Sequence, residues 1–258
     1  MSKKTAIGII NIHDQETFTQ CKNSLPNVDY VFDVHNTTKP LSNVLSKNIY
    51  NRYISYGGLS NILLRECLAV DADYIFLIKS NIVVEDKSIF EDYINTAKTF
   101  GTWFMCSGSK SDKYLSIEDE ITKKNLNLFE NLTHNFIFML KSHIKHCGFF
   151  HEGYTNIDAS DNVNCLEMYD YYSKIENKIQ YLPKGYFPDT ETSLTKLTNT
   201  NKPPNRPSLK TNNTNNITSI YGQFYYNNKF IPGKHKTAKQ EEAINSLEKI
   251  QQIYATQS

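Results

Sequence analysis

Asp71-Ala-Asp-Tyr-Ile-Phe-Leu-Ile-Lys-Ser-Asn81 is the stretch of this chain that decides its fold class. Its centre, residues 73–78, is an apolar run rich in aromatic and β-branched side chains. Such a run is typical of a strand that is buried on both faces, as in a parallel sheet covered by helices. Three polar residues, Lys79, Ser80 and Asn81, follow directly at the end of this strand.

Strands and helices alternate on both sides of this stretch. Further strands are expected at residues 6–12, 29–35, 102–107, 135–140 and 179–182. Helices are expected at 14–25, 60–70 (with Ser60 as N-cap), 88–100, 117–132, 141–147 and 161–177. This alternation predicts an α/β fold with a mostly parallel, Rossmann-like sheet flanked by helices.

The composition changes near residue 190 and divides the chain into an α/β domain, 1–190, and a C-terminal extension, 191–258. Residues 195–219 form a polar tract of Asn, Thr, Lys and Pro, which cannot bury enough apolar surface to order itself. We expect the domain, another subunit or a larger assembly to hold it. An aromatic segment (221–230) and an amphipathic helix (237–254) complete the extension. The lysines and tyrosines of 202–236 suit a polyanion or a sugar, but packing against the domain is the more common interpretation.

Charge and cysteine content narrow the class of protein. The chain has 28 basic and 27 acidic side chains, so its formal net charge is +1. No global field draws it to nucleic acid or to an anionic membrane, although a local basic groove stays open as an alternative. Five scattered Cys without a CxxC pair argue against a disulfide framework and a zinc knuckle. We therefore expect a cytoplasmic protein without a membrane span or signal peptide, in the host cytoplasm or the virion if it is viral.

Common catalytic motifs are missing from the sequence. It has no phosphate loop of the GxxxxGK[ST] type, no GxGxxG, no HExxH and no GxSxG. His143 and His146 lie three residues apart on an expected helix and could pair on a metal. A solvated helix face is the more common interpretation of such a pair.

An ordered series of weak motifs is more informative. In chain order the series comprises Asn11, Asp33-Val-His-Asn36, Gly57-Gly-Leu-Ser-Asn61, the stretch 71–81, Cys147-Gly-Phe-Phe-His-Glu-Gly-Tyr154 and Ala159-Ser-Asp-Asn-Val-Asn-Cys-Leu166. This series resembles the family 2 type of nucleotide-sugar glycosyltransferases of the GT-A fold, over roughly residues 5–182. The resemblance implies a GT-A-like domain that transfers a sugar from a nucleotide-sugar donor to an unknown acceptor.

The resemblance also implies roles for single residues. Gly57, Gly58 and Asn61 match the glycine and asparagine that open the helix before the third strand. Asn11 and Asp33 take the places that contact the nucleotide, Asn61 is assigned to the same donor, and Lys79 and Asn81 are assigned to its diphosphate.

Asp161 takes the place of the acid that deprotonates the acceptor hydroxyl in inverting members of the family. The alternative is that Asp161 is an N-cap or first-turn acid of the following helix. Glu152 and Asp158 are reserve candidates on the acceptor side.

The chain departs from the family at the metal-binding acids. The family holds magnesium or manganese with paired carboxylates at the end of the third strand, whereas Lys79 and Asn81 occupy those two positions here. Glu85 and Asp86 are better explained as acids that begin the next helix than as replacement ligands.

Three interpretations follow from this departure. In the first, Lys79 itself neutralises the diphosphate and the enzyme is metal-independent. In the second, the chemistry has been lost and the chain is a structural or interaction module of an assembly such as a viral particle. The third and weakest is sugar transfer to a nucleic-acid base, which needs a basic groove.

Overall fold

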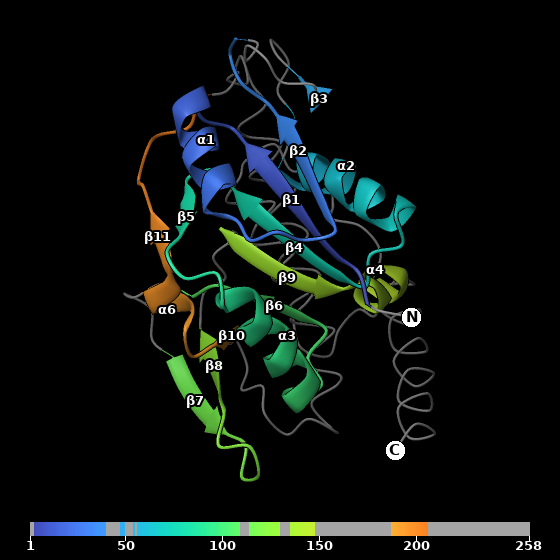
Figure 1. Cartoon of the computed structure of the whole chain (residues 1–258), viewed down its shortest axis with the longest axis vertical. Coiled ribbons are helices and arrows are strands. Elements are labelled where there is room, and N and C mark those ends of the chain that lie inside the picture. Colours follow the sequence, from blue (N-terminus) through green and yellow to red (C-terminus); the bar gives the residue numbers. More distant parts are fainter. Residues whose placement is uncertain are drawn as a thin grey trace, which may run out of the picture.

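The computed structural model describes residues 3–39, 47–49, 54, 56–108, 114–129, 135–147 and 187–205. Several predicted features lie outside these residues: the strand at 179–182, the helix at 161–177, the segment 148–154, and the extension beyond residue 205. The residues described form one main sheet with helices on both faces and two smaller sheets beside it (Figure 1).

Six strands of the described residues form the main sheet, in the order β3-β2-β1-β4-β9-β6. Their bounds are β1 Thr5–Asn11, β2 Tyr30–His35, β3 Lys47–Asn48, β4 Tyr74–Lys79, β6 Phe104–Cys106 and β9 Phe136–Leu140. Pairing is parallel from β3 through β2 and β1 to β4, and β9 is antiparallel to both β4 and β6. The predicted α/β fold with a mostly parallel sheet is therefore confirmed.

Helices cover both faces of this sheet. Their bounds are α1 Gln15–Ser24, α2 Tyr56–Ala69, α3 Ile89–Phe100 and α4 Lys141–Cys147. On one face, Phe18 of α1 meets His35 with ring centroids 4.6 Å apart, and Tyr93 of α3 meets Phe76 of β4. On the other face, α2 lies so close to β1 that a Cβ added at Gly8 would lie 3.0 Å from Leu63 Cβ. The prediction that Ser60 caps this helix is wrong, because α2 begins at Tyr56.

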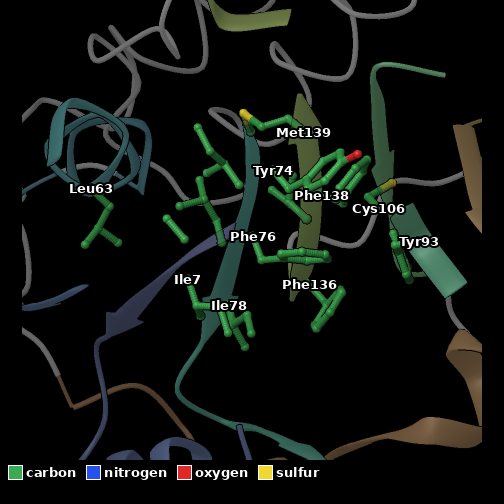
Figure 2. Close-up of a cluster of buried hydrophobic side chains, with 14 of the residues drawn as sticks. Ile7, Leu63, Tyr74, Phe76, Ile78, Tyr93, Cys106, Phe136, Phe138 and Met139 are labelled. Carbon is green, nitrogen blue, oxygen red and sulfur yellow. The ribbon is translucent and has the colours of Figure 1, made fainter. Parts of the chain in front are cut away.

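The core beneath α3 is aromatic. Phe76 of β4 contacts Phe136 and Phe138 of β9 and Tyr93 of α3, with centroid separations of 5.6, 5.0 and 6.3 Å. All four side chains are fully buried, and Figure 2 shows them gathered on one side of β4, with Leu63 on the other. These residues come from the apolar runs that predicted the two strands. Side chains of a strand alternate between the two faces of the sheet, so residues two apart, such as Phe136 and Phe138, both lie under α3.

The segment expected as a helix at 117–132 is instead a β-hairpin, so that prediction is wrong. Strands β7 (Tyr114–Glu118) and β8 (Asn125–Phe129) pair antiparallel around a turn in which the Asp119 carboxylate accepts the Thr122 N–H at 2.7 Å. Lys123 has a φ of 57°, in the left-handed region. Asn125-Leu-Asn-Leu alternates apolar and polar residues with period two, a strand signal that the helical interpretation overlooked.

Residues 187–205 return to pack on this framework. Strand β10 (Phe187–Thr190) joins β8, helix α6 spans Ser193–Lys196, and β11 (Leu197–Asn199) pairs antiparallel with β5 (Ile82–Val84). The predicted division at residue 190 falls inside this run. No helix among the described residues is both long enough and apolar enough to cross a bilayer.

Candidate functional site

The topology of the main sheet marks one place at its edge. From β1 the chain moves to β2 and β3, and then returns through α2 to β4 on the other side of β1. The strand order therefore reverses between β1 and β4. In open α/β sheets, ligands bind outside the carboxyl ends of the strands at such a reversal. Asn11 ends β1 and Lys79 ends β4, so both predicted residues lie at this switch point.

A buried chain of hydrogen bonds occupies the α1 face of the switch point. His35 Nε2 lies 2.6 Å from the Asp33 carboxylate, and the Asn11 amide nitrogen lies 3.0 Å from His35 Nδ1. The Asn11 amide oxygen accepts the Ser80 hydroxyl at 2.7 Å and the His13 backbone N–H at 2.9 Å. His13 Nδ1 lies 2.8 Å from the Ser80 Oγ.

One pattern of protons satisfies this whole chain of bonds. The Asp33 carboxylate accepts from His35 Nε2–H, which leaves His35 Nδ1 as the acceptor for the Asn11 amide. Because the Ser80 hydroxyl donates to Asn11, its oxygen accepts from His13 Nδ1–H. The network thus connects the ends of β1, β2 and β4.

Asn11 and Asp33 are placed beneath the edge of the sheet rather than on its surface. Asn11 is 0% exposed, and both ends of its amide are used inside the network. The Asp33 side chain is 6% exposed and also lies 3.6 Å from Lys22 Nζ. Contact of these two side chains with a nucleotide stays a prediction. In this conformation they fix the shape of the edge.

His13 is a polar residue of the switch point that the sequence motifs did not single out. It follows β1, is 2% exposed, and its pKa is lowered to about 4, chiefly because burial disfavours the charged imidazolium. Lys79 and Lys202 lower this pKa further, whereas Asp14 and a backbone hydrogen bond with Lys202 oppose the shift. His13 is therefore neutral at pH 7. The available signal was the Asn11–His13 spacing, two polar residues interrupting an otherwise apolar strand end.

Lys79 lies on the α2 face of the sheet, opposite Asn11. The register pairs Ile10 with Lys79, so Lys79 shares the face of Ile10 and not that of Asn11. Its ammonium lies 4.7 Å from the centroid of the Tyr56 ring, at the start of α2. Gly57, Gly58 and Asn61 lie in the first two turns of the same helix and are buried. The structure thus brings Lys79 and the start of α2 together.

Asn81 lies at the rim beside β5. Its side-chain amide donates to the Asn199 side chain at 2.9 Å, and its carbonyl accepts the Thr200 N–H at 2.9 Å. Among the described residues the Asn81 amide oxygen is buried and has no hydrogen-bond partner. One neutral amide oxygen and the Lys79 ammonium do not supply the anionic oxygen ligands that a magnesium or manganese ion needs. Among the described residues, no three His, Cys, Asp or Glu side chains converge as a metal site would require.

The acids that follow Asn81 belong to the next helix. The Asp86 carboxylate accepts the Ser88 N–H at 2.9 Å just before α3, and this bond is the first cause of its lowered pKa. Asp86 also lies 3.5 Å from Lys196 Nζ. Glu85 is exposed. The sequence preference for a helix-start role over a ligand role agrees with this geometry.

The remaining candidates divide into two groups. Asp161, Glu152 and Asp158 lie outside the described residues, and their roles stay predictions. His143 is buried, with its ring 5.3 Å from that of Phe104, so the expectation of a solvated helix face is wrong for this residue. The side chain of His146 lies outside the described set.

A segment far along the chain crosses the switch point. We call residues 197–205 the strap; it runs from β11 beside β5 toward α1 (Figure 1). The Asn205 N–H donates to the Ile12 carbonyl at 2.7 Å, and the Asn205 carbonyl accepts the Thr38 N–H at 3.2 Å. The strap therefore contacts the chain just beyond the ends of β4, β1 and β2.

Comparisons with known proteins give similarities in structure alone. No protein-family model and no curated protein matches the chain. Residues 1–349 of TarS from S. aureus, in complex with UDP-GlcNAc, align with a TM-score of 0.47 and 12% identity, covering 65% of this chain and 53% of that one. The same protein in complex with UDP aligns with a TM-score of 0.45 and 11% identity, covering 65% of this chain and 54% of that one. A197 from STIV aligns with a TM-score of 0.31 and 11% identity, covering 55% of this chain and 67% of that one. This chain spans about half the length of the TarS structures that it matches.

Proposed function

We propose that this chain is a GT-A-like glycosyltransferase that binds a nucleotide-sugar at the carboxyl ends of β1 and β4 without a divalent cation. One observation carries the proposal. Lys79 lies at the switch point, the place where open α/β sheets bind ligands, and the sequence resemblance assigns it the position of a metal-binding acid. The ordered motifs of the sequence support the choice of a nucleotide-sugar as the ligand.

Lys79 supplies the chemistry that a metal ion would otherwise bring. A diphosphate leaving group gains negative charge as the glycosidic bond breaks, and a nearby ammonium stabilises that charge. Lysine binds phosphate as a compact point charge with three donors. The Tyr56 ring, 4.7 Å from the ammonium, holds Lys79 beside the start of α2.

The acceptor side of the reaction rests on Asp161. Its carboxylate would take the proton of the acceptor hydroxyl as that oxygen attacks the anomeric carbon of the sugar. The buried network of Asn11, His35 and Asp33 would keep the edge of the sheet rigid, so that donor and acceptor meet in one geometry. The acceptor itself is an undefined nucleophile in this proposal.

A second candidate is a non-catalytic module derived from such an enzyme. The observation that favours it is the strap, which lies across the edge where a ligand would enter. In that case the switch point would be permanently filled by the chain itself. The two candidates differ in whether a nucleotide binds to the native protein.

A thermal-shift titration separates the two candidates. UDP, GDP, CDP and their sugar conjugates are each added to the intact protein, in EDTA and in manganese. A ligand that binds only the native state raises the melting temperature. We expect a concentration-dependent rise in EDTA with one nucleotide family. A rise only with manganese would contradict metal independence, and no rise with any nucleotide would favour the non-catalytic module.

A further inference from the structure

The strap is attached to the framework in two different ways along its length. Its base is anchored in the interior: the buried carboxylate of Asp189 accepts hydrogen bonds from Tyr93, Ser193 and the Gly108 N–H. Lys196 then forms an ion pair with Asp92 at 2.6 Å. These contacts fix the chain immediately before residue 197.

Beyond its base, the strap is held by polar contacts near the surface. Asn199 bonds Asn81, Lys202 pairs with Glu16 at 3.0 Å, and the Asn205 amide oxygen accepts the Thr38 hydroxyl at 2.8 Å. All three contacts are exposed, and exposed ion pairs contribute at most about 1 kcal/mol each. Leu197 is the only apolar side chain of the strap that packs on the core. Segments with few buried apolar contacts open first.

What the docked strap covers is polar. His13, which has the Lys202 backbone of the strap among its surroundings, is 2% exposed, and Ser80, 2.8 Å from the His13 Nδ1, is 0% exposed. The strap runs past His13, whose surroundings include the backbone of Lys202, and it bonds the neighbouring carbonyl of Ile12. Hydroxyl and imidazole groups can both donate and accept hydrogen bonds. If a ligand replaced the strap, these two side chains could form hydrogen bonds with the ligand.

We propose that the strap is an autoinhibitory cover that pivots after residue 199, where its pairing with β5 ends, and that its release lets His13 and Ser80 contact the diphosphate of the ligand beside Lys79. This inference rests on the proposed function. It adds two binding residues from the α1 face to the lysine on the α2 face, so that the ligand is held from both sides of the switch point. The docked strap and the bound ligand exclude each other.

A reversible covalent lock tests the strap. The Thr38 hydroxyl donates a hydrogen bond to the Asn205 amide oxygen, and both residues are exposed. The double variant Thr38→Cys/Asn205→Cys is compared by titration calorimetry in its oxidised and reduced states, with UDP and inorganic diphosphate as probes in EDTA. We expect oxidation to weaken binding at least tenfold and reduction to restore it. The two single variants, treated identically, are the controls.

Hydrogen exchange supplies a second readout on the unmodified protein. The amide N–H groups of Thr200 and Asn205 bond the Asn81 and Ile12 carbonyls when the strap is docked. Saturating UDP should therefore speed the exchange of these two amides, while the Lys79 amide, bonded to the Asn135 carbonyl, keeps its protection. Slower exchange at Thr200 and Asn205 would overturn the proposal.

The outcomes distinguish the strap from the proposed function. Equal UDP binding in the oxidised and reduced double variant overturns the strap proposal and leaves the proposed function standing. If the cysteines do not join, the exchange experiment on the unmodified protein decides alone. If neither the reduced variant nor the unmodified protein binds UDP, GDP, CDP or inorganic diphosphate, the proposed function is overturned, and the autoinhibitory role with it.

Discussion

Buried polar side chains, rather than exposed ones, shape the switch-point edge of this sheet, where we propose that a ligand binds. His35 has a central role, because its two ring nitrogens join the Asp33 carboxylate to the Asn11 amide. Leaving a buried donor or acceptor without its partner costs more free energy than the bond itself contributes. The network therefore stabilises one arrangement of the three strand ends.

Replacing His35 should expose this cost. His35→Phe keeps a ring against Phe18 but removes both nitrogens, so Asp33 and Asn11 each lose a buried bond. We expect the free energy of unfolding to fall by about 3 kcal/mol. Urea denaturation measures it, with Tyr30→Phe on the same strand as the control. A loss below about 0.5 kcal/mol, the scale of neutral surface changes, would show that the network contributes little.

His13 should make stability depend on pH. The unfolded chain takes up its proton near the ordinary pKa of 6.5, whereas folding lowers that pKa to about 4. Between these values the unfolded state binds more protons, so this contribution to stability is present above pH 6.5 and is lost as pH falls toward 4. Urea unfolding of the wild type and His13→Gln from pH 7 to 4.5 should show their stability difference shifting in favour of the variant as pH falls. A difference independent of pH would contradict the assignment.

Single residues were predicted from the sequence only in part. The apolar runs before Asn11 and Lys79 predicted that both lie at strand ends, as they do, while their roles in binding stay predictions. The motif order did not single out His13, whose surroundings include the backbone of Lys202 far along the chain, or Ser80, whose hydroxyl bonds Asn11 and lies beside the His13 ring. Nor could it show that Asn11 and Lys79 point to opposite faces, which follows from the strand register.

At the scale of elements, the contact between β1 and α2 sets the position of the α2 start. Gly8 permits this contact: an added Cβ would lie 2.9 Å from Leu77 Cδ2 and 3.0 Å from Leu63 Cβ. The start of α2, with Tyr56 against Lys79, therefore depends on a residue without a side chain at position 8.

Gly8→Ala should destabilise the protein through overpacking, by about 1–3 kcal/mol in the free energy of unfolding. Gly101→Ala is the comparison, because its Cβ would meet nothing within 4 Å and only its φ of 67° causes strain. We expect that strain to cost about 1 kcal/mol. Chemical denaturation gives both values, and a stability of Gly8→Ala equal to that of the wild type would contradict the close packing.

Elements with strong periodicity were predicted correctly, and those without it were not. Strands β1 and β4 follow from continuous apolar runs, and helix α3 from its amphipathic spacing before Gly101. The hairpin of β7 and β8 was taken for a helix, because its strands are short and their polar residues suit either structure. Pairing with β10, which comes much later in the chain, supplies the missing stabilisation.

At the scale of the molecule, Asp189 of β10 connects the three-stranded sheet β10-β8-β7 to the main framework. Its two carboxylate oxygens receive bonds from Tyr93 and Ser193 and from the backbone N–H groups of Gly108 and Thr190, at 2.6 and 2.7 Å for the last two. Burial raises the pKa of Asp189 to about 7, although these four donors oppose the rise. The segment that carries the strap is thus fastened at one buried acid.

Asp189→Asn should weaken this junction. An amide nitrogen would replace one acceptor oxygen and would face a backbone N–H that cannot turn away. We expect a loss of about 2 kcal/mol in the free energy of unfolding. Glu191→Gln, which alters an exposed bond to Asn125, is the matched control in the same denaturant series. Equal stability of the two variants would contradict the role of Asp189.

The sequence predicted the α/β architecture and the location of the candidate site but not how the chain closes over it. Alternating strands and helices carry the architecture, because periodicity is local information. The return of residues 187–205 depends on pairing with β8 and β5, on one buried acid and on exposed polar contacts, all made with partners distant in sequence. The composition of residues 195–219 led us to expect that the domain, another subunit or an assembly holds this tract, but not where it packs.

Binding of UDP to Lys79 in the absence of metal is the measurement that tests the central claim most directly. Titration calorimetry in EDTA compares the wild type, Lys79→Ala and the control Lys98→Ala. Lys98 is a matched control because its ammonium also lies near an aromatic ring, 5.9 Å from the centroid of Tyr74, but at the other end of β4. We expect Lys79→Ala to weaken binding about tenfold, equivalent to about 1.4 kcal/mol, and Lys98→Ala to leave it unchanged. Equal affinity of wild type and Lys79→Ala would contradict the claim that this lysine takes the place of the metal.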